Sequence, residues 1–130
     1  MIPANIVFDS WWNLNYSFHQ GRSCELKDGK WGFEDRLHRV VIPYTYDYAG
    51  DFNEGLACVG IGEEDYMKYG YIDRRGNTVI PFIYDKPAQF ADGIAYVKKD
   101  GKYGTIDKDG NEQIPLIYDW VGFQLNQNKG

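Results

Sequence analysis

The sequence predicts an all-β protein, built of three-stranded antiparallel β-meander repeats that stack side by side as a solenoid-like array. The first observation is composition: of 130 residues, 15 are glycine and 17% are aromatic, which favours short strands and tight turns over a helical bundle. The second is an internal repeat. A small closed ring, propeller- or barrel-like, is the alternative, although propeller blades normally have four strands. The repeat is marked by Lys30-Trp31-Gly32, Lys68-Tyr69-Gly70 and Lys102-Tyr103-Gly104.

The same order of motifs follows each of these glycines. An Ile-Pro pair comes first, then Tyr-Asp, and then, in the first two copies, a Phe-x-x-Gly element. An upstream segment matches the second half of this pattern at the same spacing, so it is interpreted as a degenerate half-copy. We therefore expect one repeat domain, 1–130, divided into 1–29 (degenerate half-copy), 30–67 (repeat 1), 68–101 (repeat 2) and 102–130 (repeat 3, truncated).

The third copy shows why each repeat should form a meander. Residues 94–97 are β-prone, and the Asp100-Gly101 pair that follows supplies the positive φ of a two-residue hairpin turn. Residues 103–107 then form the returning strand. Asp109-Gly110 predicts a second turn of the same kind, and residues 113–118 form the third strand.

Three recurring positions carry more specific expectations. His38 stands where the other copies have glycine in the second turn, and histidine tolerates the left-handed region better than most residues. The repeated proline cannot donate to a β-ladder, so it should lie at a strand edge or bend. The strand glycine should leave a gap that a neighbouring aromatic ring covers. These prolines are Pro43, Pro81 and Pro115, and these glycines are Gly32, Gly70 and Gly104.

Together these motifs resemble the WG-repeat family of bacterial proteins. The family pattern is Lys-Trp/Tyr-Gly-aromatic-Ile-Asp, a glycine turn, Ile-Pro, Tyr-Asp and Phe-x-x-Gly-Leu-Ala, and the resemblance covers about residues 18–119. Copy one departs from it at 33–35 and copy three after Tyr118-Asp119. The resemblance implies a β-rich repeat array with an interaction-type function and no shared catalytic residues.

Charge and cysteine content narrow the classes of function. A net charge of −5 disfavours capture of a nucleic-acid backbone, and no apolar run reaches the roughly 20 residues of a membrane helix. With no secretory signal at the N-terminus, we expect a cytoplasmic protein. Two cysteines and two scattered histidines predict no metal site and no cofactor; the sequence leaves open whether Cys24 and Cys58 are bonded.

The recurring carboxylates argue against an enzyme. General acid–base catalysis needs a few carboxylates in one special environment, whereas a repeat places the same aspartate in the same environment several times. Aspartates in such positions typically cap turns and loops. The periodic residues are Asp47, Asp85, Asp119, Asp73, Asp107, Asp100 and Asp109.

Function is therefore sought where the repeat is broken. The clearest break is an acidic hairpin tip, Glu63, Glu64, Asp65 and Tyr66, and the second is Trp11 in the half-copy. We expect a non-enzymatic protein–protein interaction module that binds a protein partner with a basic surface. Its most specific form is an acidic inhibitor or immunity-type protein for a basic toxin. The alternative is a carbohydrate or cell-envelope binding domain that uses exposed Trp and Tyr; the oligomeric state and the partner's identity stay open.

Overall fold

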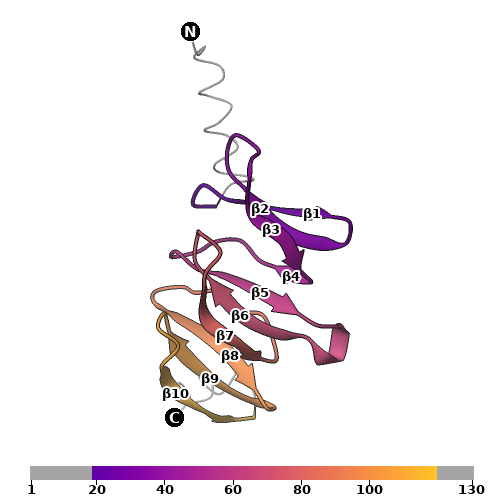
Figure 1. Cartoon of the computed structure of the whole chain (residues 1–130). Helices are drawn as coiled ribbons and strands as arrows, with labels where there is room; N and C mark the ends of the chain where they lie inside the picture. Colours follow the sequence, from indigo (N-terminus) through magenta and orange to yellow (C-terminus); the bar gives the residue numbers. More distant parts are fainter. Residues whose placement is uncertain (1–18, 120–130) are drawn as a thin grey trace.

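The computed structural model describes residues 19–119, and these residues form three antiparallel sheets (Figure 1). The predicted all-β fold class is confirmed, and the sheets stack as an open array. One turn of 3-10 helix, η1 (Glu64–Tyr66), interrupts the second sheet. The strands are β1 (Ser23–Lys27), β2 (Lys30–Glu34) and β3 (Val40–Tyr46) in the first sheet, β4 (Tyr48–Ala49), β5 (Ala57–Ile61), β6 (Lys68–Ile72) and β7 (Thr78–Tyr84) in the second, and β8 (Ile94–Lys99), β9 (Lys102–Asp107) and β10 (Glu112–Tyr118) in the third.

Each sheet contains one meander of consecutive strands, namely β1-β2-β3, β5-β6-β7 and β8-β9-β10, and β4 adds a short edge to the second sheet. The Lys-aromatic-Gly motif opens the middle strand of each meander. A meander therefore takes its first strand from the end of one sequence copy and its other two strands from the next. Such a unit must stack on a neighbour to bury its apolar surface.

The first hairpin of two meanders uses the predicted two-residue turn. Asp28 and Gly29 have φ of 51° and 82°, and Asp100 and Gly101 have the same pair of values. Positive φ at both central residues is the type I′ geometry, which matches the twist of the flanking strands. This prediction is confirmed.

The second turn of the meander is of a different kind from the one predicted. Only its third residue, Gly110, has positive φ (90°), and Asp109 does not. The Asp107 N–H donates to the Asn111 carbonyl at 2.9 Å and the Gly110 N–H to the Asp107 carbonyl at 3.0 Å, which closes a three-residue loop. His38 takes the same place in copy one with φ of 62°, as predicted.

The Ile-Pro motif and the strand glycine form one structural device. In the second sheet, Tyr69 pairs with Tyr84 and Tyr71 with Ile80. One residue, Gly70, thus faces the three residues 81–83 of an edge strand that bulges at its proline. The edge-strand position of the prolines is confirmed, because β3, β7 and β10 all lie at sheet edges.

The expectation that an aromatic ring covers these glycines is wrong. A Cβ on Gly70 would lie 2.7 Å from the Ile80 carbonyl oxygen and 2.9 Å from the Pro81 carbonyl carbon. The backbone of the bulge fills the space above the glycine, because three residues of the edge strand must fit opposite one residue of the middle strand. Gly32 and Gly104 meet the bulges of β3 and β10 in the same way.

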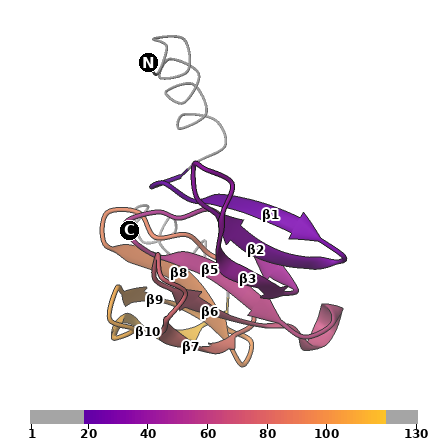
Figure 2. The same cartoon turned by 45° about the horizontal axis from the view of Figure 1, so that its top comes forward.

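The three sheets are stacked (Figure 2). Two layers of apolar side chains lie between them. We call the side of a sheet that faces the following meander its forward face and the opposite side its back face. Strand alternation gives the middle sheet apolar side chains on both faces. The layer between the first and second sheets contains Phe33, Ile42, Phe52, Ala57, Val59 and Ile72; the layer between the second and third contains Leu56, Cys58, Tyr71, Ile80, Tyr84, Phe90, Ala95, Val97 and Ile106.

Both cysteines are free thiols in separate layers. Burial is the largest cause that raises the pKa of Cys58 to about 11 and that of Cys24 to about 12, from an ordinary value of 9.0. Cys58 is buried and Cys24 partly buried, and thiols in such surroundings behave as small hydrophobes.

We expect both thiols of the folded protein to react slowly with an aromatic disulfide reagent at pH 8. A pKa near 11 lowers the thiolate fraction of Cys58 about 100-fold relative to an ordinary thiol. Because the pKa of each thiol is higher in the folded protein than in the unfolded chain, the unfolded chain loses its thiol protons first. Burial of the two neutral thiols therefore leaves the free energy of unfolding unaffected below pH 9 and lowers it as the pH rises from 9 toward 11. Labelling rates measured with and without urea check the slow reaction of the folded protein. Equally fast labelling of the folded and the urea-unfolded protein would contradict it.

Candidate functional site

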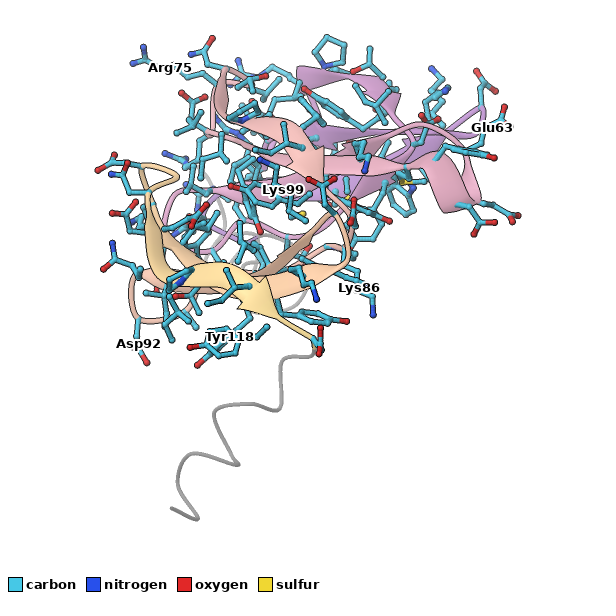
Figure 3. All side chains as sticks on the ribbon, turned by 90° about the horizontal axis from the view of Figure 1, so that it is seen from below. Glu63, Arg75, Lys86, Asp92, Lys99 and Tyr118 are labelled. Atoms are coloured by element: carbon cyan, nitrogen blue, oxygen red, sulfur yellow. The ribbon has the colours of Figure 1, made fainter. Side chains whose placement is uncertain are left out.

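The loop between β5 and β6, Gly62 to Met67, is where the regular two-residue hairpin is replaced. Gly62 has φ of 123°, and a Cβ there would lie 2.8 Å from the Tyr66 carbonyl oxygen, so the loop needs glycine at its start. The Gly62 N–H donates to Asp47 Oδ2 at 2.8 Å, which ties the loop to the end of β3. Figure 3 shows Glu63 at the tip of this hairpin, well away from the Arg75 turn.

The structure brings together the four site residues predicted in this loop. Glu63, Glu64, Asp65 and Tyr66 are all exposed, Tyr66 by 84%, and they line a shallow hollow on the surface. Within residues 19–119, none of these four side chains makes an ion pair or a hydrogen bond. Their charges and the tyrosine ring are therefore turned to solvent. The remaining predicted site residue, Trp11, lies outside the described residues.

The carboxylates of the Tyr-Asp motif have a different environment. Asp47 accepts a hydrogen bond from Lys30 Nζ at 2.5 Å, and this bond is the largest cause that lowers the pKa of Asp47. Its other oxygen holds the Gly62 N–H. The same lysine–aspartate pair recurs at 2.5 Å in the other copies, as Lys68–Asp85 and Lys102–Asp119. These pairs fasten the start of each middle strand to the end of the third.

The aspartate at the end of each middle strand caps the turn that follows it. Asp107 Oδ1 accepts the N–H groups of Asp109 and Asn111, both at 2.9 Å. The hydrogen bond from Asn111 is the largest cause that lowers the pKa of Asp107. Asp35 and Asp73 cap their turns with the same two bonds. The predicted capping role is confirmed for Asp73 and Asp107, and Asp35 has the same role in copy one. The lowered pKa values of these aspartates do not suit a general acid at neutral pH.

Two further features of the described segment 19–119 bear on the kind of site. It holds no group of three or more His, Cys, Asp or Glu side chains that would suit a metal ion. None of its helices is long and apolar enough to cross a membrane.

Sequence reasoning missed a polar cluster on the back face of the first sheet, made of Ser23, Glu25, Glu34 and Tyr44. Tyr44 Oη donates to Glu34 Oε2 at 2.5 Å, and Ser23 Oγ donates to Glu25 Oε2. The signal was present in the repeat alignment, because the matching residues of the second copy are Ala57, Val59, Ile72 and Phe82.

Stacked meanders with a recurring Lys–Asp ion pair and a β-bulge packed on a strand glycine define a linear β-repeat protein. The chain belongs to the WG containing repeat family, whose sequence profile matches residues 31–63, 69–103 and 103–124. No curated protein and no solved structure matches the chain. The predicted family resemblance is thereby confirmed.

Proposed function

We propose that this protein is a non-enzymatic protein-binding module whose contact element is the Gly62 to Met67 loop. The observation that supports this most is a contrast between two sets of carboxylates. The repeated aspartates are held by lysines and backbone N–H groups, whereas Glu63, Glu64 and Asp65 are exposed and have no partner within residues 19–119.

The chemistry of the loop suits a basic protein surface. Three adjacent carboxylates steer a cationic partner and raise its association rate. The Tyr66 ring adds apolar area and a polar tip, which is typical of an interface anchor. The bond from Gly62 to Asp47 limits the motion of the loop, so less freedom is lost on binding. In its most specific form the partner is a basic toxin that this acidic protein inhibits in the cytoplasm, where both thiols stay reduced.

Charge reversal tests this function with a fluorescent peptide rich in arginine and lysine. We expect the Glu63→Lys/Glu64→Lys variant to bind the peptide at least about 10-fold more weakly than the native chain in fluorescence anisotropy at low salt. The control is Asp109→Lys/Glu112→Lys, which changes net charge equally on exposed residues of the β9–β10 hairpin. Equal loss in both variants would show that only net charge matters and would contradict a role for the loop.

The tyrosine is tested separately. Tyr66→Ala should weaken peptide binding about 10-fold while the urea midpoint stays unchanged, because the ring is 84% exposed and stabilises nothing in the fold. Unchanged binding would remove the anchor role from the proposal.

A further inference from the structure

The two ends of the array differ in chemistry. On the back face of the first sheet, the Ser23 hydroxyl donates to the Glu25 carboxylate and the Tyr44 hydroxyl donates to the Glu34 carboxylate. Lys27 Nζ lies 5.8 Å from the centre of the Tyr44 ring and adds a further charge. This face lacks the aliphatic surface that makes the other back faces pack. In the second and third sheets the matching positions hold Ala57, Val59, Ile72 and Phe82, and Ala95, Val97, Ile106 and Leu116, all packed in the two apolar layers.

The forward face at the other end keeps the features of a packing surface. In the first two sheets Ile42 and Ile80 are each 1% exposed, because the next meander covers them. Each lies under the turn glycine of that next meander: a Cβ on Gly76 would meet Ile42 at 3.2 Å, and one on Gly110 would meet Ile80 at 3.5 Å. The third sheet has Ile114 in this position, and it is partly exposed.

Tyr96 and Tyr118 of this third forward face differ from their counterparts in the second sheet in the same direction. Cys58 is 2% exposed on the second sheet, whereas Tyr96, at the matching position of β8, is 43% exposed. Tyr118, which matches the buried Tyr84, is only partly buried. Ile114 and Tyr96 are thus more accessible than the matching Ile80 and Cys58 of the second sheet, whereas Thr105, at the position of Tyr71, is 1% exposed.

We propose that the forward face of the third sheet docks the aliphatic back face of a further WG-type meander carried by another chain. The kind of partner is inferred from the array itself. The forward faces of the first and second sheets are each covered by the back face of such a meander within this molecule. A second copy of this chain does not fit, because burying Glu25 and Glu34 against Tyr96 and Ile114 would strip water from carboxylates without offering them a cation. Within residues 19–119 the array is therefore directional: the back face of its first sheet is polar, whereas the forward face of its third sheet has the partly exposed Ile114 and Tyr96.

The sharpest test gives the full chain an aliphatic back face. The variant Ser23→Ala/Glu25→Val/Glu34→Ile reproduces the pattern of Ala57, Val59 and Ile72, so each molecule then carries both halves of the interface. We expect head-to-tail assembly into open oligomers that grow with concentration in analytical ultracentrifugation, since such a contact does not close on itself. Adding Tyr96→Glu should weaken this assembly about 30-fold.

Two results would overturn the proposal. One is a triple variant with native circular dichroism that stays monomeric, as expected if residues 120–130 of the chain itself occupy the face. The other is assembly that Tyr96→Glu leaves unchanged, since the contact would then lie elsewhere.

An insertion variant covers the case in which the triple variant does not fold. A copy of residues 86–119 is inserted after Asp119 in the full chain, and we expect one unfolding transition with a urea m-value about a third larger. The matched control carries Ala95→Ser/Val97→Glu/Ile106→Glu in the inserted copy only, and its insert should unfold separately. Separate unfolding of the unmodified insert would overturn the proposal.

Discussion

Replacing Gly70 by alanine is expected to destabilise the protein by about 3 kcal/mol, although the change adds one methyl group. The new Cβ would lie 2.7 Å from the Ile80 carbonyl oxygen and 2.9 Å from the Pro81 carbonyl carbon. Both atoms belong to the backbone of a bulge and cannot rotate away as a flexible side chain can. Relief requires β7 to move off β6, which separates paired strands and opens the layer around Ile80.

Urea unfolding of Gly70→Ala and Gly50→Ala measures this effect against a matched control. Gly50 also has a φ outside the positive range, and the nearest atom to a Cβ there is the Tyr48 hydroxyl oxygen at 3.6 Å. Gly50→Ala should therefore be neutral or slightly stabilising, because alanine lowers the entropy of the unfolded chain. Similar free energies of unfolding for the two variants would contradict the packing of the bulge on Gly70.

Replacing Phe90 by alanine is expected to cost about 4 kcal/mol of the free energy of unfolding. Phe90 is 1% exposed and meets the Tyr71 ring edge to face, with ring centres 5.0 Å apart. The Tyr71 hydroxyl donates to the Ala88 carbonyl at 2.8 Å, so this ring also holds the linker that carries Phe90. The first copy repeats the arrangement with Phe33 and Phe52, whose ring centres are 4.9 Å apart.

Two variants separate loss of packing from loss of an aromatic ring as such. Phe90→Leu keeps most of the buried volume and should cost less than about 1.5 kcal/mol. Tyr66→Ala removes an exposed ring of similar size and should leave the free energy of unfolding unchanged. A Phe90→Ala variant as stable as Tyr66→Ala would show that the linker does not join the stacked meanders.

Local chemistry made the hairpins readable from the sequence. An Asp-Gly pair between β-prone runs needs no distant partner to adopt positive φ, and Asp100-Gly101 does so as predicted. His38 was readable for the same reason, since the backbone preference belongs to the residue itself. The second turn was misread because two positive-φ residues were assumed, whereas the Asp107 carboxylate holds a longer loop that needs only one.

The candidate loop was readable as a break in the repeat, and the structure adds how its side chains are placed. Four extra residues after Gly60 identified an irregular, acidic tip. The carboxylates of Asp47 and Asp85 form ion pairs with lysines of the same chain. Whether the carboxylates of the loop do so depends on which lysines lie within reach of them. Distances of that kind follow from strand pairing and cannot be read from spacing in the chain.

The sequence by itself determined the all-β class, the family, the two-residue hairpins and the irregular acidic tip, because each depends on neighbouring residues or on a motif copied at a regular interval. Only the tertiary structure decided what fills the space above Gly32, Gly70 and Gly104, and which face of each sheet looks toward the next. The physical reason is that a strand's two faces alternate residue by residue, while their surroundings are set by sheets that come from other parts of the chain.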